Sequence, residues 1–140
     1  MLIAIRISGL VKLPQKVEQT LSRLRLRRKY AAVLLKPTEE NSKILKKIRN
    51  YIAYGVIDKK TLTDLIKKRG IPLDKEKKVD PESVVSQLEK KSPSELSIKP
   101  FFRLHPPRGG IDSKKHFPVT AKAVLGDNKE KINDLVRRML

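Results

Sequence analysis

The apolar positions switch between two periods along the first half of the chain. Residues 1–7 are rich in isoleucine and end before a Ser-Gly turn signal, which predicts a strand. Pro14 fits the first turn of a helix, where its missing N–H costs nothing. The apolar stripe of that helix recurs at i, i+4 and i+7 and consists of Val17, Leu21 and Leu24. The continuous apolar run Ala31–Leu35 predicts a buried strand.

The same succession, a helix pattern followed by a strand pattern, repeats over the next 20 or so residues. Thr38 is the expected N-cap of a second helix, and two glutamates follow it near the positive helix end. This helix is expected to stop near Asn50, and its apolar face is assigned to Ile44, Leu45, Ile48 and Ile52. Residues 51–57 contain enough aromatic and β-branched side chains for a third strand. The β-α-β-α-β order predicts a two-layer α/β unit in which helices cover a sheet.

Helical spacing returns after the third strand. A third helix is predicted from Thr61, because Asp64 completes a capping-box-like start, and Gly70 is the expected end. The inward-facing residues of this helix are Leu62, Leu65 and Ile66. Residues 80–81, an Asp-Pro pair, are a candidate start for a further short helix.

The last forty residues contain a strand, a proline- and glycine-rich loop and a helix. Residues 101–104 predict the strand, which enters a Pro-Pro-Arg-Gly-Gly loop at residues 106–110. The helix is expected to start around residues 127–128, and its apolar stripe is Ile132, Leu135, Val136 and Met139.

The composition of the chain indicates a polyanionic partner. The 140 residues contain 33 Lys and Arg but only 15 Asp and Glu, a formal net charge of +18, and 39% hydrophobic residues. That hydrophobic content is too high for a disordered basic tail. No cysteine is present, which excludes thiolate zinc sites, iron–sulfur clusters and cysteine nucleophiles. The longest uncharged stretch, residues 50–57, is far shorter than the roughly 20 residues of a spanning helix, and Arg6 interrupts the apolar start before a signal-peptide core forms.

The positive charge is unevenly distributed. The net charge is +8 over residues 1–36, +5 over residues 37–70, −1 over residues 71–97 and +6 over residues 98–140. Dense phosphates reward many Lys and Arg contacts by releasing condensed counterions, so nucleic acid is the favoured polyanion. The neutral stretch is the candidate for a face turned away from it.

The densest basic cluster follows the first predicted helix and consists of Arg23, Arg25, Arg27, Arg28 and Lys29. Arginine offers a planar fork for bidentate bonds to phosphate, so one interpretation of the cluster is a phosphate grip. The alternative is a solvated helix end that complements the helix dipole. Five cations without an acidic residue favour the first interpretation.

The second basic segment is the loop entered by the strand at residues 101–104. Its prolines stiffen the entry, and its two glycines permit a close approach to another backbone. The candidate contacts to a sugar–phosphate strand are Arg103, His105, Arg108, Gly109 and Gly110. An ordinary tight turn remains the alternative. Phe101 and Phe102 are either base-stacking residues or core residues, and core packing is expected for at least one of them.

Catalytic and metal chemistry find little support. His105 and His116 lie eleven residues apart without a third ligand at metal spacing, so no zinc site is predicted. No nucleophile elbow and no P-loop are present. We therefore expect no enzyme activity, no cofactor and no metal.

Five motifs follow one another along the chain in a distinctive order. They are Ile5-Arg6-Ile7-Ser8-Gly9, Leu24-Arg25-Leu26-Arg27-Arg28, Tyr51-Ile52-Ala53-Tyr54-Gly55, Leu65-Ile66-Lys67-Lys68-Arg69-Gly70 and Phe102-Arg103-Leu104 with Pro107-Arg108-Gly109-Gly110. This succession resembles one protein family, the large-subunit ribosomal protein called L-thirty in bacteria and archaea and L-seven in eukaryotes. The resemblance spans most of the chain and is poorest across residues 71–97. Bacterial members resemble only the first sixty or so residues. The continuation beyond them, and a start directly at the first strand, resemble the archaeal type.

The resemblance implies a β-α-β-α-β core over residues 1–58 with an antiparallel sheet, a ferredoxin-like arrangement. A helical and loop extension over residues 59–140 is expected to pack on this core. It also implies binding to large-subunit ribosomal RNA near the 5S RNA region, as a monomer beside neighbouring ribosomal proteins in the cytoplasmic ribosome. Residues expected to contact RNA, taken from the basic segments and the matching motifs, are Lys12, Lys16, Arg23, Arg25, Arg27, Arg28, Lys29, Arg69, Arg103, His105, Arg108, Gly109, Gly110, Lys114 and Lys115.

The runner-up from composition alone is a small, non-ribosomal, nucleic-acid-binding regulator. A helix-turn-helix regulator needs two adjacent helices joined by a short turn. In this chain a predicted strand separates the first two helices, which counts against that class.

Overall fold

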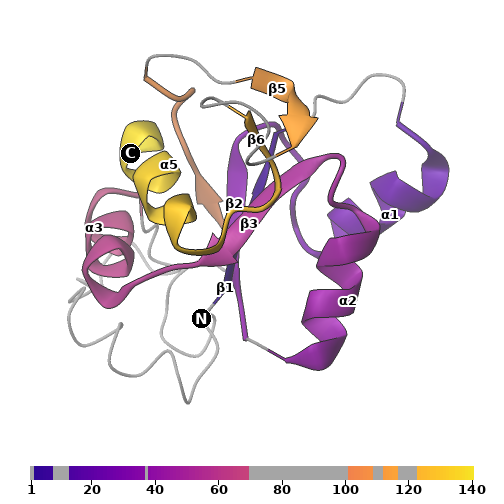
Figure 1. Ribbon diagram of the computed structural model, residues 1–140, viewed down its shortest axis with the longest axis horizontal. Coiled ribbons are helices and arrows are strands. Elements are labelled where there is room, and N and C mark those ends of the chain that lie inside the picture. Colours follow the sequence, from indigo (N-terminus) through magenta and orange to yellow (C-terminus); the bar gives the residue numbers. More distant parts are fainter. Residues whose placement is uncertain (1, 8–12, 37, 70–100, 109–111, 117–122) are drawn as a thin grey trace, which may run out of the picture.

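A six-stranded sheet runs through the centre of the fold, with the strand order β4-β2-β1-β3-β6-β5. The computed structural model describes residues 2–7, 13–36, 38–69, 101–108, 112–116 and 123–140 (Figure 1). The strands are β1 (Leu2–Arg6), β2 (Ala31–Leu35), β3 (Ile52–Val56), β4 (Phe102–Arg103), β5 (Asp112–His116) and β6 (Ala123–Asp127). The three strands predicted in the first sixty residues, and the one near residue 102, are confirmed.

The first four strands pair in antiparallel fashion, as the family resemblance implied. β1 lies between β2 and β3, with Ile3 opposite both Leu34 and Gly55. β4 pairs with β2 on the outer side. The pairs β3–β6 and β6–β5 are parallel, and neither β5 nor β6 was predicted. β5 reads Asp-Ser-Lys-Lys-His and β6 contains a glycine, so local β propensity is weak in both and their pairing comes from tertiary contacts.

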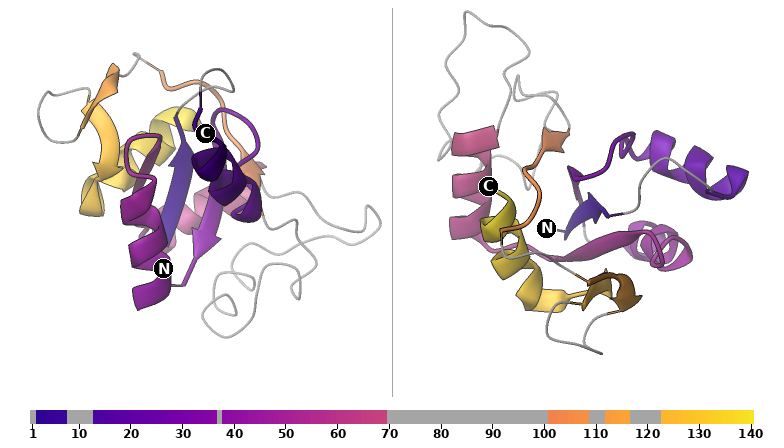
Figure 2. Two further views of the ribbon diagram at one scale, coloured as in Figure 1. Left: turned by 90° about the vertical axis from the view of Figure 1, so that its right-hand side faces the viewer. Right: turned by 90° about the horizontal axis from the view of Figure 1, so that it is seen from above.

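Helices cover both faces of this sheet (Figure 2). α1 (Gln15–Arg23) and α2 (Glu39–Lys47) lie on one face and complete the predicted two-layer β-α-β-α-β unit. α3 (Lys59–Arg69) and α5 (Ile132–Met139), the latter preceded by the 3₁₀ turn η1 (Lys129–Lys131), lie on the other face. The described parts of the extension thus share the sheet of the core.

The strand alternation explains why β1 is buried along its length. Ile3, Ile5 and Ile7 point to the face covered by α3 and α5. Ala4 points to the face covered by α1 and α2. Since both faces are covered, the successive residues from Ile3 to Ile7 are all buried, and all of them except Arg6 are apolar.

The observed bounds of α2 differ from those expected from the apolar pattern. α2 ends at Lys47, before Asn50, and Ile52 belongs to β3 rather than to the face of α2. The N-cap at Thr38 is confirmed, because its hydroxyl accepts the backbone N–H of Asn41 at 3.3 Å.

The start of α3 was predicted at Thr61, which is wrong by two residues. Asp58 caps the helix instead, because its Oδ1 accepts the backbone N–H of Thr61 at 2.7 Å. This hydrogen bond is the main cause that lowers the pKa of the Asp58 carboxyl below its usual value. Thr61 itself is buried with the predicted inward residues Leu62, Leu65 and Ile66.

The C-terminal helix also begins later than residues 127–128. Asp127 ends β6, and the backbone N–H of Asn128 donates to the carbonyl of Tyr54 in β3 at 2.7 Å. The predicted apolar stripe is confirmed, because all four of its members are buried: Ile132, Leu135, Val136 and Met139. The predictions for Gly70 and for a helix at residues 80–81 lie outside the described residues.

α3 and α5 are joined by side chains of α5. Asn133 accepts the backbone N–H of Asp58 at 2.9 Å and donates to the carbonyl of Val56 at 3.2 Å, which ties α5 to the β3–α3 turn. Arg137 forms an ion pair with Asp64 of α3 at 3.1 Å. Both side chains of this pair are partly exposed, so its contribution to stability is small.

Candidate nucleic-acid interface

The basic cluster forms an ordered loop at the end of α1. We call residues 23–30 the basic loop. The backbone N–H of Leu26 donates to the carbonyl of Leu21 at 2.8 Å, and that of Arg25 donates to the carbonyl of Ser22 at 3.0 Å. This pair of bonds is the Schellman arrangement that ends many helices. Leu21 and Leu26 are both buried, and they supply the hydrophobic contact that accompanies it.

Two residues of the basic loop have left-handed backbone. Arg25 and Tyr30 each have φ of 65°. Arg25 occupies the position after the helix where glycine is usual. Leu26 is the fully buried residue of the loop, and the surrounding cations are exposed: Arg23, Arg25, Arg27, Arg28 and Lys29. The loop therefore presents several cations from a backbone held by a buried anchor.

The segment 101–108 lies directly beside the basic loop. β4 pairs with the start of β2, which places Arg103 opposite Ala31. The pairing continues past the strands, because the backbone N–H of Leu104 donates to the carbonyl of Tyr30 at 3.0 Å. Two basic segments more than seventy residues apart in the sequence are thus hydrogen-bonded neighbours. The structure brings together the two candidate contact segments.

Burial alternates along the segment 101–108. Phe102 and Leu104 are buried, whereas Arg103, His105 and Arg108 are exposed. The expectation that at least one of the two phenylalanines packs in the core is confirmed by Phe102. Phe101 is partly exposed, and the guanidinium carbon of Arg103 lies 5.8 Å from its ring centroid. On the neighbouring loop, the Lys29 ammonium lies 5.1 Å from the ring centroid of Tyr30.

The far end of the segment 101–108 is attached to the last turn of α5. The backbone N–H of His105 donates to the carbonyl of Met139 at 2.8 Å. Arg108 and Arg138 exchange two further hydrogen bonds. These contacts add the end of α5, with Arg138, to the edge of the candidate interface. Arg138 is not among the candidate contact residues of the sequence analysis, because nothing local signals a contact thirty residues away.

The remaining candidate residues are placed less centrally. Lys16 is exposed on α1, and Arg69 is partly exposed at the end of α3, which covers the opposite face of the sheet. Lys114 and Lys115 belong to β5, of which only the backbone is described. The predictions for Lys12, Gly109 and Gly110 lie outside the described residues.

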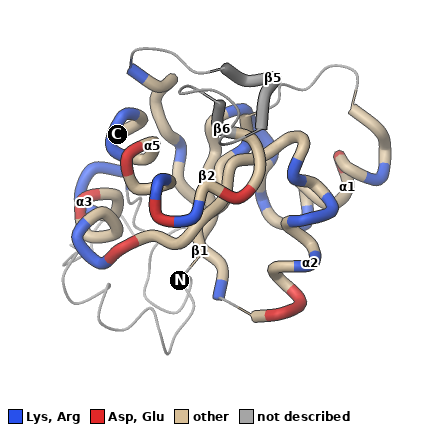
Figure 3. Tube along the Cα trace, viewed as in Figure 1, with Lys and Arg blue, Asp and Glu red and all other residues tan. Residues whose placement is uncertain are grey.

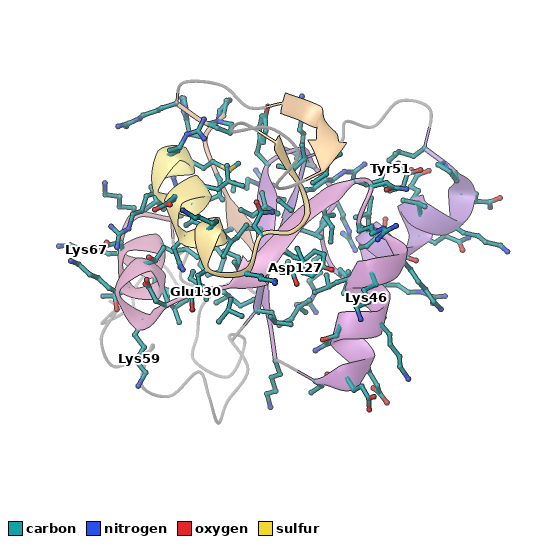
Figure 4. The ribbon with its side chains drawn as sticks, in the orientation of Figure 1. Lys46, Tyr51, Lys59, Lys67, Asp127 and Glu130 are labelled. Atoms are coloured by element: carbon teal, nitrogen blue, oxygen red, sulfur yellow. The ribbon has the colours of Figure 1, made fainter. Side chains whose placement is uncertain are left out.

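Basic residues also occur on the helices away from this edge. Figure 3 shows Lys and Arg on α1, α2 and α3 as well as near the end of α5. Lys59 and Lys67 extend from α3 away from the sheet (Figure 4). Such exposed lysines are typical of solvated helix faces. What distinguishes the basic loop and the segment 101–108 is that backbone hydrogen bonding holds them side by side, so that cations of two distant segments lie at one edge.

Neither a metal cluster nor a membrane span is found in the described ranges. Among the residues that the structure describes, no three His, Cys, Asp or Glu side chains gather in a way that could hold a metal ion. No helix within those ranges is both long and apolar enough to cross a membrane.

Comparison with known proteins identifies relatives of this chain. The sequence model of the family described as Ribosomal protein L30p/L7e matches residues 2–52. The large ribosomal subunit protein uL30 of Desulfurococcus amylolyticus is 37% identical, over 97% of this chain and 96% of the relative. The proteins of the same name from Nanoarchaeum equitans and Methanococcus maripaludis are also 37% identical and are covered over 96% and 97% of their lengths. The chain therefore belongs to the ribosomal protein L30p/L7e family.

Proposed function

We propose that this protein is a structural component of the large ribosomal subunit and binds large-subunit ribosomal RNA through the basic loop and the segment 101–108. The observation that carries the proposal is the hydrogen bond from Leu104 to the carbonyl of Tyr30, which joins the two basic segments. Membership of the L30p/L7e family, with archaeal relatives named as large-subunit proteins, supports the ribosome as the setting.

The exposed cations suit a folded RNA backbone. The arginine side chains can each make paired hydrogen bonds to a phosphate, which a lysine cannot do. Several of them project from a backbone fixed by buried residues on both segments, so little backbone freedom is lost on binding. Partly exposed Phe101 lies beside Arg103 at the same edge, where it could stack on an unpaired base.

The remaining parts of the proposal follow the family resemblance. The protein acts as a monomer near 5S RNA, beside other ribosomal proteins, in the cytoplasm, and without enzymatic activity. Residues 1–58 form the RNA-binding core, and residues 59–140 extend it with the loop that includes Arg108, Gly109 and Gly110. Arg69, Lys114 and Lys115 are proposed as additional RNA contacts in this extension.

The test is the affinity of the full chain for large-subunit ribosomal RNA as a function of salt. If about five to eight phosphates are contacted, affinity falls by roughly two to five powers of ten between about 50 and 200 mM salt. Replacing Arg25, Arg27 and Arg28 together by Ala should weaken binding strongly and flatten this salt dependence. The matched control replaces Lys59, Lys67 and Lys68, three exposed cations of α3, together by Ala. This variant should keep most of the RNA affinity.

Two outcomes would contradict the proposal. Equal losses from both triple variants would mean that only net charge matters. Equal affinity for duplex DNA of any sequence would favour the runner-up, a non-ribosomal nucleic-acid-binding regulator. Co-sedimentation of the native protein with large subunits, reversed only by high salt, is the expected result in cell extracts.

A further inference from the structure

Arg6 is a buried cation at the end of the central strand. Arg6 is 1% exposed, and its side chain is among the largest that are fully buried. Strand alternation places it with Leu2 and Ala4 on the face covered by α1 and α2. The other two residues at this face are apolar, so packing alone would be satisfied by an apolar residue at position 6.

Arg6 contacts the basic loop at two points. Its guanidinium Nη1 donates to the carbonyl of Leu26 at 2.7 Å, within the protein interior. Its own backbone carbonyl accepts the N–H of Tyr30 at 2.7 Å. The first of these bonds requires the arginine side chain, whereas any residue could make the second. One residue of β1 therefore holds both Leu26 and Tyr30, which enclose Arg27, Arg28 and Lys29.

Burying the Arg6 guanidinium in the protein interior is unfavourable in itself. Burial lowers the pKa of Arg6, and the Glu18 carboxylate acts in the opposite direction. Buried charges can often be replaced by apolar residues of similar volume without loss of stability. A gain in folding stability is therefore a weak explanation for arginine at this position.

The basic loop, in contrast, is stabilised by the hydrogen bond from Arg6 to the Leu26 carbonyl. Arg25 and Tyr30 both have left-handed backbone, a conformation that such residues keep only when their surroundings impose it. The Leu26 carbonyl lies between them, and Arg6 fixes its direction. Without that bond the backbone of residues 25–30 gains alternatives in which the cations point elsewhere.

We propose that Arg6 is a positioning residue for RNA binding, which holds the basic loop in its binding conformation through the Leu26 carbonyl without touching RNA. This inference rests on the proposed function. It assigns a role in the interface to a side chain that is inaccessible to RNA.

The experiment compares Arg6→Met and Arg6→Lys in the full chain. If the binding conformation of the loop falls to about a tenth of the Arg6→Met molecules, affinity for large-subunit RNA falls about tenfold. The slope of affinity against salt should stay the same, because the bound state still makes the same phosphate contacts. A residue that touched a phosphate would lower that slope by about one. Lysine can donate to the Leu26 carbonyl from a single point, so Arg6→Lys should lose less affinity.

Amide hydrogen exchange gives a readout that does not depend on RNA. In free Arg6→Met, the amides of Leu26 and Tyr30 should exchange faster, while those of Ile3 and Ile5 in β1 stay protected. Ile5→Met is the matched control, because it changes a buried β1 residue on the opposite sheet face and should alter neither the loop amides nor the affinity. If Arg6→Met does not fold, Arg6→Lys decides by the same measurements.

The outcomes separate this inference from the proposed function. Unchanged RNA affinity and unchanged loop exchange in folded Arg6→Met would overturn the role of Arg6 alone. A changed salt slope would make Arg6 a direct contact and would also overturn it. Failure of the unmodified protein to bind large-subunit RNA would overturn the proposed function, whatever the exchange data show.

Discussion

Arg138 holds the backbone of Arg108 at both of its polar groups. The N–H of Arg108 donates to the carbonyl of Arg138 at 3.1 Å, and the Nε of Arg138 donates to the carbonyl of Arg108 at 2.9 Å. The last turn of α5 thereby sets the position of a candidate RNA contact thirty residues earlier in the chain.

Replacing Arg138 by Ala should loosen the turn at Arg108 and lower RNA affinity. The variant removes the side-chain bond to the Arg108 carbonyl, so the Arg108 amide should also exchange faster with solvent. Arg137→Ala is the control, because it removes an equal charge from the neighbouring position but breaks an ion pair with Asp64 instead. That exposed pair is worth about 0.2–1 kcal/mol in the free energy of unfolding. Equal effects of the two variants on Arg108 exchange would contradict the positioning role of Arg138.

Arg25→Gly should separate stability from binding. Arg25 has φ of 65°, which glycine adopts without a Cβ penalty, so we expect the free energy of unfolding to stay level or to rise by up to about 1 kcal/mol. RNA affinity should fall, since an exposed cation of the basic loop is lost. Arg25→Ala removes the same charge but keeps the strained conformation, and it should be the less stable of the two. Chemical denaturation and RNA titration of both variants measure this, and a Gly variant less stable than the Ala variant would refute the strain argument.

Gly55→Ala should destabilise the fold by about 1–3 kcal/mol or more, because there is no room for a methyl group. A Cβ at this position of β3 would lie 2.8 Å from the Cβ of Ile132 and would also meet the backbone carbonyl of Lys129. Since a backbone carbonyl cannot turn aside as a side chain can, η1 and the start of α5 would have to move from the sheet. Val56→Ala, at the exposed next position, is the control and should change stability by no more than about 0.5 kcal/mol. A thermal midpoint of Gly55→Ala equal to that of the unmodified protein would show that α5 does not pack so closely.

Asp58→Ala should cost about 0.5–2 kcal/mol near neutral pH, since it removes the N-cap of α3. The pKa of Asp58 is lower in the folded protein than in the unfolded chain, chiefly through the N–H of Thr61. Its stabilising effect is therefore fully present above the unfolded pKa, near 3.9, and is lost as the pH falls through the lower folded value. The difference in unfolding free energy between the two proteins should shrink as the pH falls below about 4.

Asp58→Asn keeps a capping oxygen without a titratable group. This variant should be more stable than Asp58→Ala at neutral pH, and the gap between those two should not depend on this titration. A gap between the unmodified protein and Asp58→Ala that is constant from pH 7 to pH 2 would contradict the assignment of the pKa shift.

The residues that repeat with a regular period determined most elements in the described parts of the chain. Alternating isoleucines at positions 3, 5 and 7 specify a strand, and the stripe from Ile132 to Met139 specifies a helix, because burial of an apolar face depends on local spacing. The basic cluster at residues 23–29 is likewise evident in the sequence, since charge density can be counted along the chain.

Only the tertiary structure decided which of these segments meet. β5 and β6 carry weak local signals, and they become strands because β3 offers an unpaired edge. The pairing of Arg103 with Ala31 and the burial of Arg6 against Leu26 depend on residues that lie far apart in sequence. Such contacts leave no periodic trace, because each is made once and is set by how the strands are ordered in the sheet. The sequence by itself therefore determined most of the described elements and the charge, and the order of the strands decided which cations form one surface.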